Sequence, residues 1–156
     1  HETQLRSASA LLLGSCSTYA YVNTPPAPWS SADNAIDGNR DTNSGSGSCT
    51  HTLVEANPWW RGDCCAERLN GAEIHIGHSL EDNGVGNPLV GVISHVPAGR
   101  SLKVTFTKLV VGRYVTVTLT GPEKILSLCE VEVYGYHAPT GENLSTCIFY
   151  PEPLKM

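Results

Sequence analysis

The chain has 156 residues, a formal net charge of −5 at pH 7 and only 16% charged residues. This length suits a single domain that can bury its own core, and the acidic balance excludes the basic surface typical of nucleic-acid-binding proteins. The 15 glycines and 10 prolines, beside a single methionine, are typical of a turn-rich β protein. No apolar run reaches the length of a membrane span, so we expect no membrane insertion.

An extracellular location is indicated by the six cysteines, because disulfides persist in oxidising compartments. Asn143 opens an Asn-Leu-Ser triplet, which is a candidate N-glycosylation acceptor in a secreted protein. The leucine run at residues 11–13 is too short for the core of a signal peptide. We therefore expect His1 to begin a mature, secreted chain whose signal has been removed.

The first third of the chain is expected to be loop. Residues 24–31 contain three prolines, which fix φ and remove hydrogen-bond donors, so they exclude a regular helix or a central strand. Residues 37–41 predict a tight turn, and the alternating serines and glycines of residues 44–48 predict an open loop.

From residue 67 onward the pattern favours strands. Polar and apolar residues alternate at 72–77 and 101–106, and residues 114–119 are mostly β-branched. At residues 130–134, two valines share one face and two glutamates share the other. Short strands between varied loops predict an all-β, antiparallel sandwich or jelly roll with its binding site on loops at one end. We expect this domain to span residues 1–137 and a C-terminal tail to span residues 138–156.

Residues 61–68, with the sequence RGDCCAER, form the most informative motif. Two adjacent cysteines stand between two arginines, whose guanidinium groups present fixed forks of donors to oxygen acceptors such as sugar hydroxyls. The alternatives are free or separately bonded cysteines, and arginines that pair with Asp63 or Glu67. The sequence contains no nucleophile elbow, paired-carboxylate cleft or zinc motif, so we expect binding and not catalysis.

Several blocks together resemble the F-type lectins, or fucolectins, which are fucose-binding β-jelly rolls. The blocks are residues 34–40, 48–52, 57–61, 61–68, 69–74, 112–115 and 128–133, and they follow the family order from about residue 5 to residue 136. The resemblance implies a jelly-roll fold and recognition of terminal L-fucose on glycoconjugates. Defence against microbes is common in the family and enters only by analogy.

The resemblance implies three sugar ligands, His51, Arg61 and Arg68, with a Cys64–Cys65 disulfide against the apolar edge of the sugar ring. For His51 the alternative is a structural hydrogen bond. An axial hydroxyl can donate to the imidazole while it accepts from guanidinium groups. Charge-assisted hydrogen bonds contribute roughly 1.5–3 kcal/mol each, so a shallow monosaccharide site is weak. We therefore expect a homo-oligomer that gains avidity on fucosylated glycans.

The resemblance also implies a structural Ca²⁺, since oxygen ligands from a turn and one distant carboxylate suit this ion. It further implies a Cys49–Cys129 disulfide, whereas Cys16 and Cys147 are additions to the family pattern. Cys147 is expected to tether the tail to Cys16 or to another chain. The calcium ligands carried over from the family are Asn34, Asp37, Asn39, Ser48, Cys129 and Glu130.

One departure from the family concerns the stretch after Trp60. Family members continue through two more strands before the Arg-Gly-Asp-Cys-Cys run, so roughly 17 residues, about two strands' worth, are missing here. Such a loss exposes sheet edges and apolar faces. The alternative function is therefore a structural, self-assembling extracellular protein that derives from a lectin fold and has lost sugar binding.

Overall fold

The computed structural model describes residues 6–11, 19–22, 31–41, 47–51, 66–97, 99–121, 126–137 and 146–149. In this part of the chain the regular elements are short strands and single turns of 3-10 helix. The strands are β1 (Arg6–Leu11), β2 (Tyr19–Val22), β3 (Thr50–His51), β4 (Glu73–Gly77), β5 (Leu89–Val92), β6 (Val110–Gly112), β7 (Tyr114–Leu119), β8 (Ser127–Leu128), β9 (Tyr136–His137) and β10 (Cys147–Phe149); the 3-10 turns are η1 (Ala32–Ala35), η3 (Ala66–Leu69) and η4 (Glu81–Gly84).

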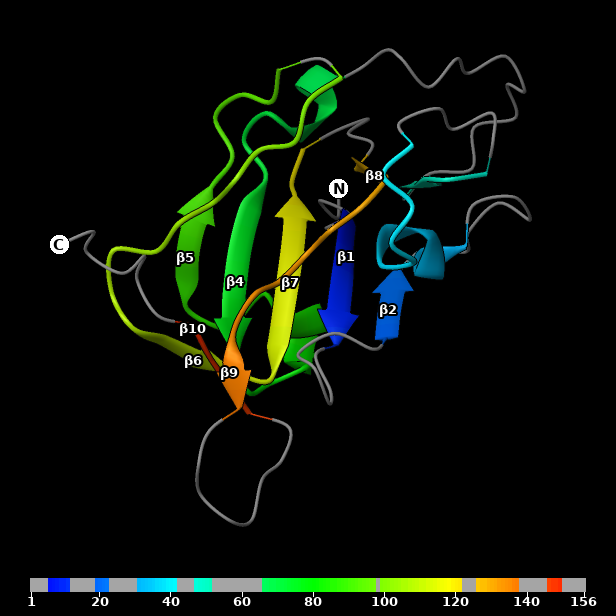
Figure 1. Cartoon of the computed structure of the whole chain (residues 1–156). Coiled ribbons are helices and arrows are strands. Elements are labelled where there is room, and N and C mark those ends of the chain that lie inside the picture. The colour runs from blue at the N-terminus through cyan, green and yellow to red at the C-terminus, as the bar shows by residue number, and fades with distance from the viewer. Residues whose placement is uncertain are drawn as a thin grey trace, which may run out of the picture.

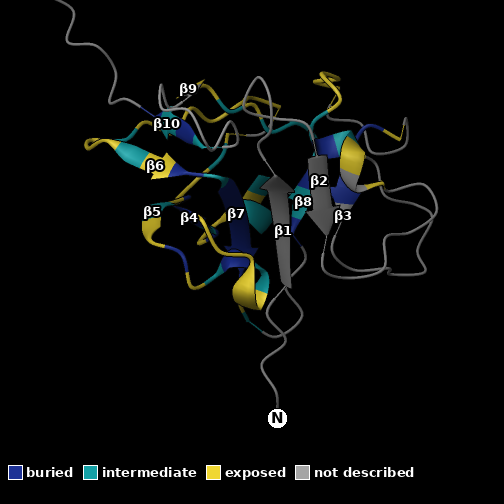
Figure 2. Ribbon diagram, turned by 90° about the horizontal axis from the view of Figure 1, so that it is seen from below, coloured by how far each residue is buried: buried dark blue, intermediate teal, exposed yellow. Residues whose placement is uncertain are grey.

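A five-stranded antiparallel sheet in the order β2-β1-β7-β4-β5 forms one layer (Figure 1). β7 lies at its centre, with Leu119 opposite Arg6 of β1 and Thr118 opposite Glu73 of β4. Every residue of β7 is buried, which Figure 2 shows as a dark blue strand. Its β-branched residues suit a pleated surface that is covered on both faces. The strand expected at residues 114–119 is confirmed with the same bounds.

The second layer is built from smaller sheets, β6-β10-β9 and β3-β8. In Figure 1 the orange segment that joins β8 to β9 crosses in front of β7. Apolar side chains from both layers form the core, and each fully buried one contributes about 1.5–3 kcal/mol. The core includes Ile74, Ile76, Val115, Val117, Leu119, Leu126, Leu128 and Phe149. This arrangement is the antiparallel sandwich that the sequence predicts.

The loop from residue 78 to residue 88 covers the other face of β7. Asn87 holds the loop closed, because its amide donates to the Ser79 carbonyl at 2.8 Å and accepts from the Ser79 N–H at 3.1 Å. Gly84 has a φ of +80°, and a Cβ at this position would lie 2.4 Å from the Thr116 hydroxyl. Only glycine therefore allows the loop to approach β7 this closely.

Two predicted strands behave differently from β7. Residues 101–106 and 130–134 alternate in sequence, yet neither segment belongs to a ladder in the described structure. Leu102 and Val104 are 41% and 38% exposed, whereas Val131 and Val133 pack against the core as expected. An alternating sequence forms a ladder only where a neighbouring strand supplies the hydrogen bonds.

Two expectations about the ends of the chain are wrong. The first third is not all loop, because β1 pairs with both β2 and β7. β10 lies in the segment expected to be a tail, where Cys147 and Phe149 are 0% and 1% exposed. Pairing of β10 with β6 and β9 makes residues 147–149 part of the folded core.

Candidate functional site

Ser127 lies opposite one of the expected sugar-binding residues and accepts a hydrogen bond from another. β3 pairs with β8 in a register that places His51 opposite Ser127. Arg68, in η3, donates from Nη1 to the Ser127 hydroxyl at 3.5 Å. Directly opposed residues of an antiparallel pair have Cα atoms about 4.5–5.5 Å apart. The fold therefore brings His51 and Arg68 to the same residue.

The remaining residues expected at the sugar site lie outside the described residues, namely Arg61, Cys64 and Cys65, and of His51 only the backbone is described. Arg68 is half-buried, so part of its side chain is held by the protein. Ser127 was missed by the sequence reasoning. Ser127 could have been suspected from the sequence, because it directly precedes residues 128–133, one of the blocks that resemble the F-type lectins.

A disulfide between Cys49 and Cys129 fixes the β3–β8 ladder, as the resemblance implied. It joins the residue before β3 to the residue after β8, so it closes covalently the pair of strands that holds His51 opposite Ser127. The two cysteines are 80 positions apart. A cross-link of this span stabilises the fold by about 4.5 kcal/mol in the chain-entropy estimate.

A second disulfide ends at Cys147, which is fully buried in β10. Its partner is one of the three cysteines that lie outside the described residues, Cys16, Cys64 and Cys65. The expected pairing of Cys64 with Cys65 and the tether from Cys147 to Cys16 stay predictions. Asn143, the candidate glycosylation residue, also lies outside the described residues.

The predicted turn at residues 37–41 is present and carries several oxygen atoms. Asp37 accepts from the Asn39 N–H at 2.8 Å, and Asn39 accepts in turn from the Asp41 N–H at 3.1 Å. Side chains that bond to the backbone two residues ahead stabilise such turns. Gly38 has a φ of +81° and donates its N–H to the Glu130 carboxylate at 3.0 Å. The turn is therefore fastened to the segment that follows β8.

Glu130 lies close to a second carboxylate. Burial raises the pKa of Glu130, the hydrogen bond from Gly38 opposes this shift, and the nearby charge of Asp37 raises the pKa again. Both effects that raise the pKa disfavour the ionised form. A cation held between Asp37 and Glu130 would relieve this repulsion.

The other expected metal ligands lie beside the disulfide. Asn34 donates its amide to the Cys49 carbonyl at 3.1 Å, which leaves its amide oxygen as an acceptor. Ser48 is fully buried, with its hydroxyl 3.6 Å from the Cys49 sulfur. In the described residues no three His, Cys, Asp or Glu side chains gather as a metal site. Two carboxylates with amide and main-chain oxygens suit a hard ion such as Ca²⁺ better than Zn²⁺.

The chain is similar to several known proteins. Fucolectin-4 of Anguilla japonica is 45% identical over 139 residues, which cover 78% of this chain and 76% of that protein. Fucolectin of Anguilla anguilla is 43% identical over 137 residues, which cover 77% of this chain and 86% of that protein. No protein-family model matches the chain.

A solved fucolectin structure is also similar to this chain. The crystal structure of a fucolectin from striped bass (Morone saxatilis) serum is similar, with a TM-score of 0.66 and 50% identity. The match covers 90% of this chain but 49% of the striped bass chain, so the present chain spans about half of that protein.

The alignment lengths bear on the missing stretch. The match to Fucolectin-4 runs over 139 residues, whereas 78% of this 156-residue chain is only about 122 residues, which leaves about 17 positions opposite gaps. That number equals the length expected to be missing after Trp60, although the stretch around Trp60 itself lies outside the described residues.

No helix in the described residues is long and apolar enough to span a membrane.

The fold, the Cys49–Cys129 disulfide and the extent of identity to the Anguilla fucolectins lead to one conclusion about ancestry. The chain belongs to the F-type lectin, or fucolectin, family.

Proposed function

We propose that this protein is a non-catalytic lectin that binds terminal L-fucose on glycoconjugates through His51, Arg61 and Arg68. One observation carries the proposal. His51 stands opposite Ser127 in the β3–β8 ladder, and Arg68 donates to the hydroxyl of the same serine. The backbone of His51 and the guanidinium of Arg68 thus both lie beside Ser127, which supports the proposal.

The chemistry of these groups suits a sugar hydroxyl. A guanidinium only donates hydrogen bonds, whereas a neutral imidazole nitrogen can accept one, so a hydroxyl between them uses both of its functions. The Cys64–Cys65 disulfide would lie against the apolar edge of the ring. Each charge-assisted hydrogen bond contributes roughly 1.5–3 kcal/mol.

A structural Ca²⁺ is part of the proposal. It would be held by Asp37 and Glu130 together with oxygens of Asn34, Asn39, Ser48 and Cys129. The repulsion between the two carboxylates and the hydrogen bond from Gly38 to Glu130 support this assignment. The ion would stabilise the 37–41 turn against the segment that follows β8, close to the β3–β8 ladder.

We also propose that the protein is secreted and acts as a homo-oligomer on fucosylated glycans. The similar fucolectin from striped bass is a serum protein, which supports an extracellular location. Several copies of a weak site that act together raise the overall affinity for a surface that carries many glycans.

The test is calorimetric titration with L-fucose in the presence of Ca²⁺ and then of a chelator. We expect saturable binding by the wild type and at least about a tenfold loss in Arg68→Ala, the equivalent of about 1.4 kcal/mol. Arg100→Ala is the matched control, because Arg100 is an exposed arginine outside the site. Ser127→Ala tests positioning and should weaken binding less than Arg68→Ala.

A second candidate function rests on exposed apolar side chains. Residues 101–106 belong to no ladder among the described strands, and Leu102 and Val104 in this segment are 41% and 38% exposed. In a structural, self-assembling protein these side chains would form contacts between chains. Wild-type protein that is folded by circular dichroism but gives no heat with fucose, and that sediments as large assemblies, would favour this function.

A further inference from the structure

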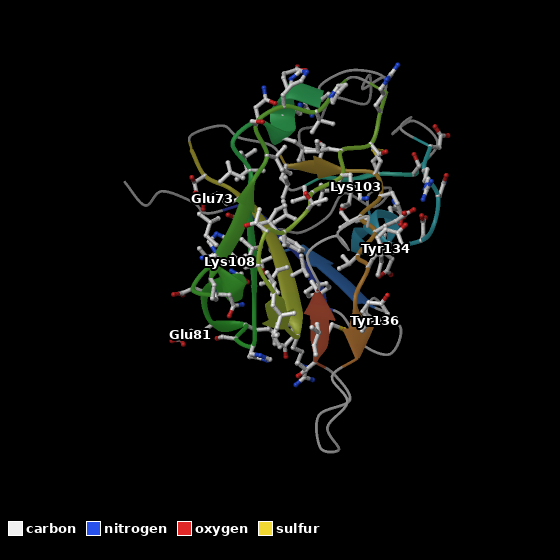
Figure 3. All side chains as sticks on the ribbon, turned by 60° about the vertical axis from the view of Figure 1, so that its left-hand side comes forward. Glu73, Glu81, Lys103, Lys108, Tyr134 and Tyr136 are labelled. Carbon is white, nitrogen blue, oxygen red and sulfur yellow. A yellow bond between two sulfur atoms is a disulfide. The ribbon has the colours of Figure 1, made fainter. Side chains whose placement is uncertain are left out.

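The segment that runs from β8 into β9 displays two large aromatic rings. Glu132, Tyr134 and Tyr136 alternate with Val131 and Val133, and the valines pack against the core. Tyr134 is 78% exposed and Tyr136 is 69% exposed. Figure 3 shows both tyrosines on the right-hand side of the molecule, along this segment. Exposed aromatic residues that lie close together commonly mark a binding surface.

A network of hydrogen bonds orients the side chains on one side of this surface. Arg40 donates from Nε and Nη2 to the two oxygens of Glu132, both at 2.6 Å. The Tyr134 hydroxyl donates to Glu132 as well. Arg40 and Glu132 are far apart in sequence, so the network is a tertiary contact. Because these polar groups are already oriented, a ligand loses less side-chain entropy when it binds to them.

The charges of the network balance each other. Arg40 and Glu132 form an ion pair, and the Tyr134 hydroxyl donates to the same carboxylate. At neutral pH one guanidinium therefore faces one carboxylate, beside a neutral phenol. An anionic ligand would meet Glu132 and a cationic ligand would meet Arg40. The surface consequently favours a neutral ligand.

The remaining donors and acceptors suit hydroxyl groups. A guanidinium has five N–H donors, and the hydrogen bonds from Arg40 to Glu132 use only those on Nε and Nη2. A sugar hydroxyl can accept from the rest and can donate to the carboxylate. The carbon-bound hydrogens of a pyranose ring form an apolar face that can lie on tyrosine.

We propose that Arg40, Glu132, Tyr134 and Tyr136 form a second carbohydrate-contact surface, which takes a neutral pyranose distinct from the terminal fucose. The inference deepens the proposed lectin function and rests on it. Tyr134 lies seven residues after Ser127, so the two are at most about 25 Å apart along the chain. A fucose held at Arg68 and Ser127 would not cover both places, whereas an extended or branched oligosaccharide could.

The test uses three probes: methyl α-L-fucoside, a neutral fucose-terminated hexasaccharide, and the same hexasaccharide without its fucose. Calorimetry on the full chain should show that Tyr134→Ala weakens binding of both hexasaccharides about three- to tenfold. Affinity for the fucoside should stay unchanged. Tyr134→Phe keeps the ring and should stay closer to the wild type than Tyr134→Ala. Leu109→Ala is the control, because Leu109 is 55% exposed next to Lys108, on the opposite side of the view in Figure 3.

Three results would overturn the inference: equal hexasaccharide affinity in Tyr134→Ala and the wild type, no hexasaccharide advantage over the fucoside, or a Tyr134→Ala protein that sediments as a smaller oligomer than the wild type. The last result would assign the tyrosines to a protein interface. If the wild type ignores the fucoside but binds the fucose-free hexasaccharide through Tyr134, the fucose proposal fails while the second surface stands.

Discussion

β7, at the centre of the five-stranded sheet, has a hydrogen-bonded strand on each side, whereas the alternating segments 101–106 and 130–134 belong to no ladder among the described residues. The two regions differ in whether an adjacent strand supplies hydrogen bonds, and not in their local sequence pattern. β7 lies between β1 and β4, and loop 78–88 covers its other face. The alignment with Fucolectin-4 also leaves about 17 positions opposite gaps, roughly the length of two strands.

The segment after β8 is held by other contacts. The N–H of Val131 donates to the Ala35 carbonyl at 2.6 Å, Glu130 accepts from Gly38, and Glu132 pairs with Arg40. The disulfide of Cys129 adds a covalent link. Point contacts and one cross-link thus take the place of a ladder. The same kind of substitution should therefore change the free energy of unfolding by different amounts in the two layers.

The largest effect is expected when the cross-link is removed. Cys49→Ala with Cys129→Ala should lower the free energy of unfolding by about 4.5 kcal/mol. Hydrogen exchange should show that the Val131 amide loses protection before the amides of β7. Equal loss in both places would mean that the two layers unfold as one unit. If the double variant does not fold, partial reduction of the wild type gives the same comparison in the fraction where peptide mapping shows Cys49 and Cys129 reduced and the Cys147 disulfide intact.

The next effect concerns calcium. Ca²⁺ at 100 times its dissociation constant should raise the free energy of unfolding by about 2.7 kcal/mol, because the ion binds the folded arrangement of Asp37 and Glu130 and not the unfolded chain. Glu130→Gln should abolish most of this gain, whereas Asp33→Asn, at an exposed acid nearby, should keep it. Thermal unfolding with calcium and with a chelator measures the difference. A gain of equal size in Glu130→Gln would remove Glu130 from the proposed ligands.

A matched pair of valines compares the layers directly. Val117 in β7 is 8% exposed and Val104 in segment 101–106 is 38% exposed. Val117→Ala should lower the free energy of unfolding by about 2 kcal/mol, because it leaves a cavity. Val104→Ala should cost clearly less in a urea titration. Equal costs that depend on protein concentration would show that a second copy buries Val104.

The smallest effect is expected at Arg40. Its ion pair with Glu132 is exposed to solvent, where such pairs contribute little. Arg40→Ala should therefore leave the urea midpoint unchanged within error, even though it should weaken hexasaccharide binding. A clear shift of the midpoint would mean that this contact stabilises the segment after β8, and the binding test would then need a gentler variant such as Arg40→Lys.

Local pattern predicted part of the fold. Residues 114–119 are mostly β-branched and form β7, and the packing of Val131 and Val133 follows from their spacing. β1 was missed because its serines and alanines have little strand preference, so its conformation depends on pairing with β7. The segment 101–106 shows the converse, since its pattern is that of a strand while no strand in the described part of the chain pairs with it.

Site residues divide in the same way. The resemblance predicted the Cys49–Cys129 pairing, which local spacing could not supply. The contact of Arg68 with Ser127 joins residues 59 positions apart, and that of Arg40 with Glu132 joins residues 92 positions apart. Contacts of this range depend on how the two layers meet, and nothing in the sequence near either partner encodes them.

The place of β1 has a consequence for how the chain acquires its structure. β1 at residues 6–11 pairs with β7 at residues 114–119, and β6 finds its partner only at residues 147–149. A nascent chain must therefore keep β1 without its β7 partner until most of the domain has been synthesised. Pairings between such distant segments slow folding, so this protein should depend on chaperones more than a helical protein of equal length.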